Sequence, residues 1–498
     1  MTPNDAYGHL LARFRRIGLL DEAGRILHWD AATMMPSGAA DGRAEQLAAL
    51  RETAHGLLTA PDVGEWLAAV DDGALDAAGR ADVALMRRRR LRAAALPGDL
   101  VTAISLADSR CEMAWRAARA ADDFATVRPL LQRVLELTRE EAQATGEALG
   151  LAPYDALLDA HEPGLAAADC ERVFAALESF LPDLLGAALE RQALRGEPLA
   201  PRGPFPAARQ DALARRVMAD LGFDFDHGRL DLSAHPMSVG APDDVRITTR
   251  WDEADALAGL YAVVHETGHA LYERGLPAAR RWQPAGEPRG MAVHESQSLI
   301  FEMQAGRSPA FAVFLAPLLA AAFGADVAWG PENLHRLVTR VRRGLIRVDA
   351  DEVSYPLHVV LRFRLERAML AGDLALADLP GAWRDGMQRL VGAVPPDDRD
   401  GCLQDIHWYD GAFGYFPSYT FGALMAAQLY DAAARAEPEM PRAVGRGDFA
   451  PLVAWLRRHV HGLGATRSWQ QILEGATGRP LDVAVFRRHL EARYLGDG

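Results

Sequence analysis

Apolar residues recur at helical spacing along most of the first two hundred positions. In the stretch 10–30, for example, Leu11, Phe14 and Ile17 fall on one side of a helix. Alanine, leucine and arginine dominate this region, and all three residue types favour helices. The pattern predicts consecutive helices as far as a proline-rich stretch at 196–206, which we interpret as a loop or a lobe boundary.

The pattern changes at 221–251, where glycine, aspartate and proline surround short segments. The segment 245–250, VRITTR, alternates β-branched and polar residues, as expected of a β-strand. We therefore predict a small sheet just before the next helix. An edge of such a sheet can bind an extended peptide through main-chain hydrogen bonds. Helical spacing then resumes, except in an aromatic, glycine-rich loop that begins near residue 395.

The helix after the predicted strand contains His265, Glu266 and His269 in the order H-E-x-x-H. Residues four apart on an α-helix differ by about 40° in direction, so both imidazoles lie on one face. Two neutral imidazoles supply half of a tetrahedral zinc site. Glu266 could then accept a proton from zinc-bound water. The alternative is a chance match, but only about 0.03 such matches are expected in a chain of this length.

Local signals delimit this helix. Asp252 followed by Asp255 is typical of a helix start and is close to a capping box. Arg274, then Gly275 and Pro277, follow the order expected at a helix end. The motif is therefore predicted to lie inside a helix.

A catalytic zinc ion needs a third protein ligand and one open position. The extended motif with a third histidine is excluded, because Tyr272 and Gly275 occupy the positions of its glycine and histidine. The nearest candidates are His294 and Glu295, in a second predicted helix that folds back beside the first. Neighbouring helix residues point about 100° apart, so only one of the two can face the metal. The residues alone leave this choice open, and an ordinary solvated carboxylate is the alternative for Glu295.

Composition narrows the possible functions. The net charge of −14 over 498 residues disfavours nucleic acid as a partner. With no run of 18 apolar residues and no N-terminal signal, we expect a soluble, cytoplasmic protein that does not bind a membrane. All 54 basic residues are arginine, which excludes Schiff-base and P-loop lysines and favours bidentate recognition of carboxylates. Three scattered cysteines argue against a disulfide framework and a cysteine metal cluster.

Short motifs follow one another in a specific order along nearly the whole chain. Besides H-E-T-G-H and the early stretch 29–50, they are S-A-H-P-M-S at 233–238, D-V-R-I-T at 244–248, H-E-S-Q-S at 294–298, I-R-V-D-A-D at 346–351, Y-P-L-H at 355–358, G-C-L-Q-D-I-H-W at 401–408 and Y-F-P-S-Y at 415–419. In this order they resemble the thermostable carboxypeptidase Taq family of metallocarboxypeptidases. Met237 and Leu299 depart from the residues usual in that family.

The resemblance implies a mainly α fold: a large helical two-lobed saddle with a deep active-site groove and a small β-sheet near the zinc helix. It implies one catalytic metallopeptidase domain over residues 1–498 that releases single C-terminal amino acids from peptides with a free C-terminus, usually as a homodimer. It assigns His265, His269 and Glu295 as metal ligands and Glu266 as the general base. Zn²⁺ is the expected ion, although Co²⁺ and Mn²⁺ can occupy such a site.

The resemblance also implies roles in substrate binding. Arg347 of I-R-V-D-A-D would anchor the C-terminal carboxylate of the substrate, and Arg246 of D-V-R-I-T is the second candidate. Without the resemblance, a surface ion pair is the ordinary role for Arg347. His235 is interpreted as a residue that orders its loop or lines the groove rather than as a ligand.

The aromatic loop supplies the remaining candidates. Tyr415 and His407 occupy positions that resemble the pair that stabilises the transition state in related peptidases. Tyr419, four residues after Tyr415, is a candidate for substrate binding. Packing in the core is the alternative for both tyrosines.

Two other functions also fit the sequence. A zinc oligopeptidase would share the metal motif but cut peptides internally, whether or not the C-terminus is free. A non-catalytic helical scaffold with a vestigial metal site would keep the ligands, but it would have no need of Glu266.

Overall fold

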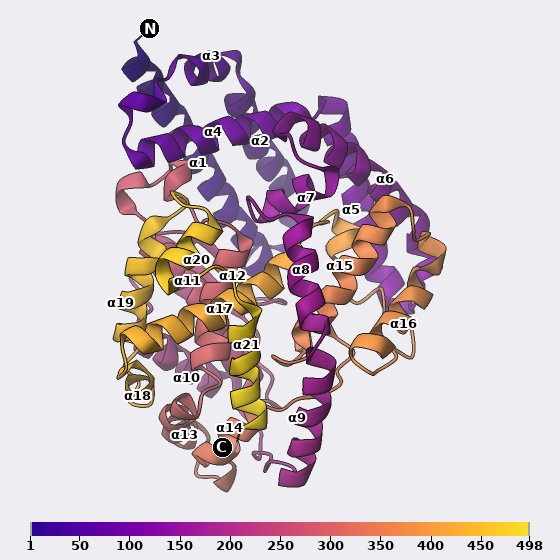
Figure 1. Cartoon of the computed structure of the whole chain (residues 1–498), viewed down its shortest axis with the longest axis vertical. Coiled ribbons are helices and arrows are strands. Elements are labelled where there is room, and N and C mark those ends of the chain that lie inside the picture. Colours follow the sequence, from indigo (N-terminus) through magenta and orange to yellow (C-terminus); the bar gives the residue numbers. More distant parts are fainter. Residues whose placement is uncertain (1, 497–498) are drawn as a thin grey trace. The chain divides into compact units, whose positions relative to one another are not determined.

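Helices make up most of the chain, as the apolar spacing predicts (Figure 1). The computed structural model describes residues 2–496. These residues form two compact units, each assembled from three separate segments of the chain. Unit 1 contains the residues up to Ala93, Pro198–Val338 and Met425–Leu481, and unit 2 contains Ala94–Glu197, Thr339–Leu424 and the residues from Asp482 onward.

Unit 1 contains the N-terminal helices, the sheet and the helix with the H-E-x-x-H motif. Its helices are α1 (Pro3–Thr33), α2 (Ala40–Thr59), α3 (Pro61–Ala69), α4 (Ala77–Ala95, which passes into unit 2 after Ala93), α10 (Ala207–Leu221), α11 (Ala258–Gly275), α12 (Met291–Leu299), α13 (Pro309–Phe323), α14 (Pro331–Val338), α18 (Met440–Val444), α19 (Ala450–His459) and α20 (Trp469–Thr477).

Unit 2 contains the middle helices of the chain and its last one. They are α5 (Gly98–Ala121), α6 (Phe124–Leu149), α7 (Pro153–His161), α8 (Ala167–Glu178), α9 (Leu181–Arg195), α15 (Tyr355–Ala371), α16 (Leu379–Leu390) and α21 (Val483–Leu490). The chain passes from unit 2 to unit 1 within α17 (Phe416–Ala436).

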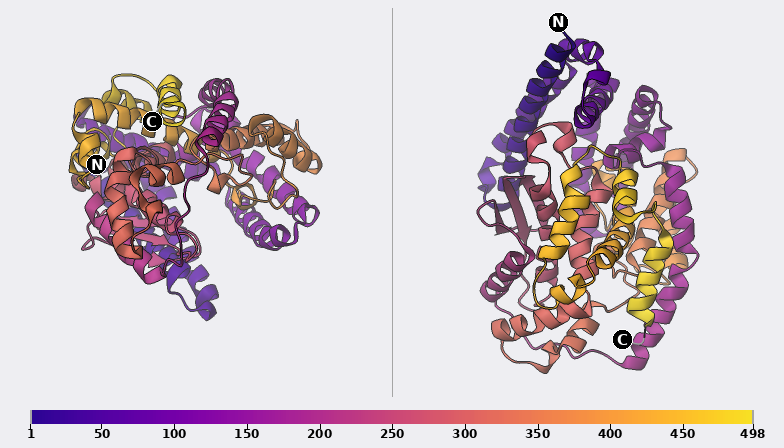
Figure 2. Two further views of the ribbon diagram at one scale, coloured as in Figure 1. Left: turned by 90° about the horizontal axis from the view of Figure 1, so that it is seen from below. Right: turned by 60° about the vertical axis from the view of Figure 1, so that its left-hand side comes forward.

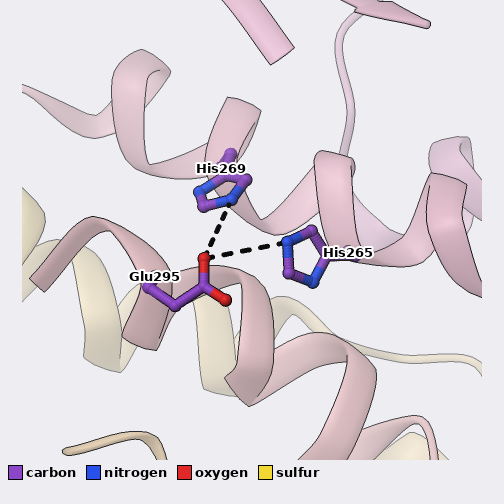
Figure 3. A group of neighbouring side chains, drawn as sticks. All are labelled: His265, His269 and Glu295. Atoms are coloured by element: carbon purple, nitrogen blue, oxygen red, sulfur yellow. Dashed lines mark ion pairs between the residues drawn. The ribbon is translucent and has the colours of Figure 1, made fainter. Parts of the chain in front are cut away.

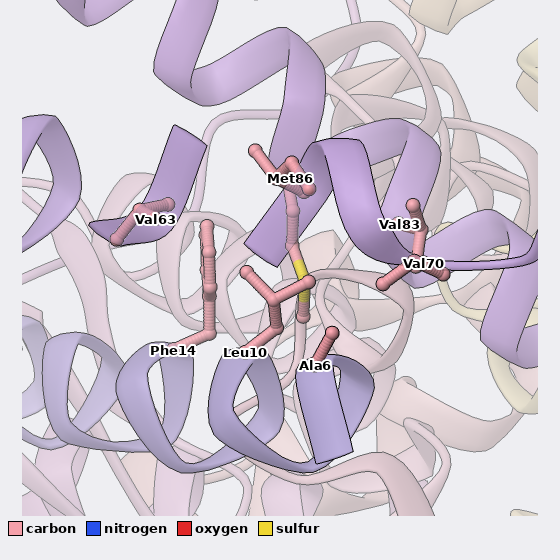
Figure 4. Packing of buried hydrophobic residues seen from close by; sticks show 8 residues of the cluster. Ala6, Leu10, Phe14, Val63, Val70, Val83 and Met86 are labelled. Atoms are coloured by element: carbon pink, nitrogen blue, oxygen red, sulfur yellow. The ribbon is translucent and has the colours of Figure 1, made fainter. Parts of the chain in front are cut away.

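An apolar cluster holds the N-terminal helices of unit 1 together (Figure 4). Its residues come from one face of α1, where they are four positions apart, and from α3 and α4 with the turn that follows α3. Burial of each large apolar side chain contributes about 1.5–3 kcal/mol relative to its exposure. The buried members are Ala6, Leu10, Phe14, Val63, Leu67, Val70, Val83 and Met86.

The predicted small sheet is confirmed and belongs to unit 1. Its strands β1 (Gly228–Leu232), β2 (Met237–Ala241) and β3 (Asp244–Thr249) lie in the order β1-β3-β2, with β1 parallel and β2 antiparallel to β3. Near its end β2 requires Gly240, which has a φ of 128° and whose Cβ would lie 2.0 Å from the backbone oxygen of Asp244 at the start of β3. β2 and β3 contact α11, and β2 also contacts α1. Figure 2 shows the sheet beside α1.

The boundaries predicted around proline are partly confirmed. Residues 196–206 are irregular between α9 and α10, and the chain changes units at Glu197–Pro198. The helical spacing after Glu295 also predicts a helical run that Pro356 kinks or splits, and the run is indeed interrupted, but over the whole of 339–354, which contains only the short 3-10 turn Arg347–Asp349. Pro356 instead lies in the first turn of α15, where a missing N–H costs no hydrogen bond. The single catalytic domain, the saddle and the groove stay predictions.

In the described part of the chain, no single helix combines the length and apolarity needed to cross a membrane. Only a bent pair, Pro284–Ala305 with Pro309–Phe323 at 78°, meets those two criteria together.

Candidate metal centre

The H-E-x-x-H motif lies in the middle of α11, as predicted, and the helix ends at Gly275. The helix start predicted at Asp252 is wrong, because the helix begins later, with Leu257 as its N-cap. Asp255 still stabilises the start, since its carboxylate accepts the N–H groups of Leu257 and Ala258 at 2.8 and 3.1 Å. These two backbone donors at the helix start therefore have acceptors, although neither forms a hydrogen bond within the helix.

The second predicted helix is confirmed as α12, which packs beside α11. Gly268 of the motif permits this approach, because a Cβ there would lie 2.6 Å from both the Gln297 backbone oxygen and the Ser298 Cα. The third segment of unit 1, Met425–Leu481, also packs against α11 and α12. The buried His461 places Nε2 3.0 Å from the Gln297 Oε1, and a Cβ on Gly275 would meet its ring at 2.4 Å.

His265, His269 and Glu295 converge between these two helices (Figure 3). One ligand atom from each lies within 4.8 Å of the others, and no other such group of His, Cys, Asp or Glu occurs in residues 2–496. The Glu295 Oε2 is 3.8 Å from the His265 Nε2 and 3.5 Å from the His269 Nε2. Two imidazoles and one carboxylate are a donor set of catalytic zinc sites. These residues therefore form a candidate metal site, with Glu295 rather than His294 facing it.

Glu302 contacts the first histidine from outside the site, a role that the motifs did not reveal. It lies in the π-helical turn Ile300–Ala305, where its Oε2 is 2.9 Å from the His265 Nδ1. Arg307 donates to its other oxygen at 2.8 Å. Burial raises the pKa of Glu302, but the hydrogen bonds from His265 and Arg307 outweigh it and lower the pKa to about 2. The carboxylate is therefore ionised and orients the imidazole.

The site strongly favours positive charge. Burial lowers the pKa of His265, but the nearby carboxylates Glu295, Glu302 and Glu266 outweigh it and raise the pKa to about 10. Burial also raises the pKa of Glu266 to about 7, against the opposing effect of His265. A carboxylate with a pKa near neutrality suits a general base, because it can both accept and return a proton.

Arg347 lies in unit 2 and is buried, with only 4 % of its surface exposed, so the surface ion pair considered for it is wrong. Its Nε and Nη2 donate to the Asp405 Oδ1 at 3.1 and 2.8 Å, and Nη1 donates to the Tyr355 hydroxyl at 3.2 Å. Arg362 donates through Nε to the same aspartate at 2.6 Å. Two guanidinium groups thus share one carboxylate. The pairing of Arg362 with Asp405 joins residues far apart in sequence and was not predicted.

The other predicted residues of unit 2 surround this ion pair. The His407 Nε2 is 3.3 Å from the Tyr419 hydroxyl, and its ring centroid is 5.5 Å from that of Tyr415. The two tyrosine rings are 5.2 Å apart, and the Arg347 guanidinium lies 4.9 Å from the Tyr419 ring. Burial and the charge of Arg347 lower the pKa of His407 to about 3, so this imidazole is neutral at physiological pH.

Arg246 and His235 lie in or next to the sheet of unit 1. Arg246 donates through Nε and Nη2 to both oxygens of Asp244, at 2.9 and 2.7 Å, and its guanidinium lies 4.2 Å from the Trp29 ring. His235 is exposed in the connection between β1 and β2, and its carbonyl accepts the Thr248 hydroxyl at 3.3 Å. That backbone contact is consistent with a residue that orders its loop.

The close approach at Gly268 leads to a test of the metal site. Gly268→Ala is expected to weaken zinc binding by about 10-fold or more, because the added methyl group forces α12, and Glu295 with it, away from the histidines. Overpacking of this kind also costs about 1–3 kcal/mol of stability. Zinc affinity by competition with a chromophoric chelator, together with thermal unfolding, measures both effects.

The matched control is Gly24→Ala in α1, where an added Cβ meets nothing within 4 Å. That variant should gain about 0.5–1 kcal/mol from helix propensity and bind zinc normally. Unchanged zinc affinity in Gly268→Ala would show that the spacing of α11 and α12 does not determine the site.

Known proteins match this chain along nearly its whole length. The model of the family described as carboxypeptidase Taq (M32) metallopeptidase matches residues 9–494. Thermostable carboxypeptidase 1 of Thermus thermophilus is 38% identical over 507 residues, which cover 99% of each chain. Metallocarboxypeptidase 1 of Trypanosoma cruzi superposes with a TM-score of 0.96 at 38% identity, over 98% of this chain and 99% of that one. An M32 carboxypeptidase from Deinococcus radiodurans superposes with a TM-score of 0.93 at 36% identity, over 98% and 99%.

Proposed function

The chain belongs to the carboxypeptidase Taq (M32) family of metallopeptidases, and on this premise we propose that it removes amino acids one at a time from the free C-terminus of peptides. The ion would be Zn²⁺, held by His265, His269 and Glu295. The observation that carries the proposal is the convergence of these three ligand atoms within 4.8 Å, beside the buried carboxylate of Glu266.

A bound zinc ion would supply Lewis acidity to the scissile carbonyl and lower the pKa of water toward neutrality. Glu266 would take the proton from the attacking water and deliver it to the departing amine. Tyr415 and the neutral His407 would donate hydrogen bonds to the oxygen on which negative charge develops; the loss of one such donor typically costs about 10²-fold or more in rate. Tyr419 would orient His407 through their 3.3 Å contact.

We assign the C-terminal carboxylate of the substrate to Arg347. Arg347 and Arg362 together carry two positive charges, and Asp405 supplies only one negative charge to them. A second carboxylate would therefore be accommodated without an excess of negative charge, and guanidinium groups bind carboxylates with good geometry. Arg246 is the weaker candidate, because its single positive charge is already matched by the one carboxylate of Asp244.

One peptide in two forms, free acid and C-terminal amide, tests the reaction. The zinc-loaded protein should shorten the free acid one residue at a time and leave the amide intact, as mass spectrometry would show. Internal cleavage of both forms would establish an oligopeptidase instead. Cleavage of neither form by a protein that contains stoichiometric zinc would favour the non-catalytic scaffold.

We also propose a homodimer as the assembly, which rests on the family resemblance alone. Light scattering of the purified protein measures its mass in solution. A mass of twice 54.1 kDa would support the dimer, and 54.1 kDa would exclude it under those conditions.

A further inference from the structure

We propose that His294 and Glu273 form a hydrogen-bonded relay that holds His269 in the tautomer required of a metal ligand; this inference rests on the proposed metal site. The His294 Nδ1 is 2.6 Å from the His269 Nδ1. On its other side, the His294 Nε2 is 3.0 Å from the Glu273 Oε1. The three side chains therefore form one continuous chain of hydrogen bonds.

The direction of the relay follows from the donors and acceptors available. An ionised Glu273 carboxylate only accepts hydrogen bonds, so the His294 Nε2 carries a proton and donates it. A metal ion at the His269 Nε2 would need the lone pair of that atom, so the proton of the 2.6 Å contact would lie on the His269 Nδ1 and be accepted by the His294 Nδ1. That tautomer leaves a lone pair on the His269 Nε2, the atom that lies 3.5 Å from the Glu295 Oε2. One carboxylate thereby orients the ligand atom through an intervening imidazole.

The two histidines of the motif are thus oriented in different ways. The Nδ1 of His265 contacts the carboxylate of Glu302 directly, whereas the Nδ1 of His269 is linked to the carboxylate of Glu273 through His294. Glu273 lies four residues after His269 on α11, and positions four apart on a helix are neighbours. The relay therefore begins and ends on one rigid helix, and only its middle residue comes from α12.

The packing around His294 keeps its ring in place. Its side chain is 18% exposed, and its ring centroid lies 5.3 Å from that of Tyr272, which is buried and belongs to α11. His294 does not belong to the group of converging ligand atoms, whose members are His265, His269 and Glu295. The histidine next to Glu295 is therefore a positioning residue for the second ligand and not a fourth ligand.

The test measures zinc affinity in full-length variants by competition with a chromophoric chelator. His294→Phe keeps a ring against Tyr272 but removes both nitrogens, and it should weaken zinc binding by about 10–100-fold. Glu273→Leu should also weaken zinc binding. Glu273→Gln should bind nearly as tightly as the parent chain, because its amide oxygen still accepts the His294 N–H.

Two further measurements separate a relay from a structural role and from direct ligation. In a relay, Glu273→Leu has no additional effect once His294→Phe is present, so the losses are not additive. The visible spectrum of the Co²⁺-substituted protein reports coordination number, and it should be the same in His294→Phe as in the parent chain. The exposed His55 on α2 gives the matched control, and His55→Phe should leave zinc affinity unchanged.

The outcomes are distinguishable. Parent-like zinc affinity in His294→Phe would overturn the relay and leave the metal site intact. A changed Co²⁺ spectrum in that variant would make His294 a ligand and would also overturn the relay. If the parent chain binds no stoichiometric zinc, the proposed metal site fails and the relay fails with it.

Discussion

Glu266→Gln is expected to lower kcat by about 10²–10⁴-fold and to leave one zinc ion bound per chain. Glutamine has nearly the shape of glutamate but cannot accept a proton from water. Glu266 supplies none of the three converging ligand atoms, so a glutamine side chain in its place should not disturb the metal. Glu266 is also only 8 % exposed, so bulk water cannot readily take over its role as the base. Steady-state kinetics with one free-acid peptide, combined with elemental analysis of zinc, measures both quantities.

His269→Gln serves as the control for this prediction. That variant should lose zinc and activity together, whereas Glu266→Gln should lose activity alone. A Glu266→Gln enzyme with the kcat of the parent chain would remove this residue from the role of base. Loss of zinc from it would mean that Glu266 also contributes to metal binding.

Arg347→Ala is expected to lower kcat/KM for free-acid peptides by about 10²-fold or more, mainly through KM. The loss of a charged hydrogen-bond partner from a buried pair typically costs about 2–5 kcal/mol. Asp405 keeps the guanidinium of Arg362, so the variant does not leave an unpaired buried carboxylate. Any residual activity on peptide amides should not change. Kinetics on the matched acid and amide therefore measure the contribution of the carboxylate directly.

Two further variants sharpen this test. Arg347→Lys keeps the charge but loses the planar fork of donors. Its kcat/KM for free-acid peptides should therefore lie between the values of the parent chain and Arg347→Ala. Arg364→Ala removes a partly exposed arginine of α15 that pairs with Glu171 and Glu178, and it should leave the preference for free acids unchanged. If Arg347→Ala still discriminates acid from amide as the parent chain does, the carboxylate binds elsewhere.

Local spacing was sufficient to predict the residues of α11 that face the metal site. His265 and His269 are four apart on one helix, so their convergence depends on helix geometry alone. The choice between His294 and Glu295 was different, because it depends on how α12 is rotated against α11. The structure shows that both contact the second histidine, at opposite sides of its ring. Periodicity within one helix carries no information on that rotation.

The residues missed by sequence reasoning have contacts that local patterns do not encode. Glu302 is seven positions after Glu295, two turns on a regular helix, but a π-helical turn lies at this point. Asp405 and Arg362 meet across 43 positions of the chain. The start of α11 was placed too early because Asp255 does cap backbone N–H groups, but those of the residues immediately after it.

The interleaving of the two units has a consequence for biosynthesis. Unit 1 takes its last segment, Met425–Leu481, from late in the chain, after the ribosome has made the unit 2 segment Thr339–Leu424. At about 5–20 residues per second, Gln297 therefore waits on the order of ten seconds or more for its partner His461 to be synthesised. During that interval α11 and α12 lack the part of their packing that His461 supplies. Neither unit corresponds to one continuous stretch of the gene, so a simple truncation of the chain removes part of at least one unit rather than one whole unit.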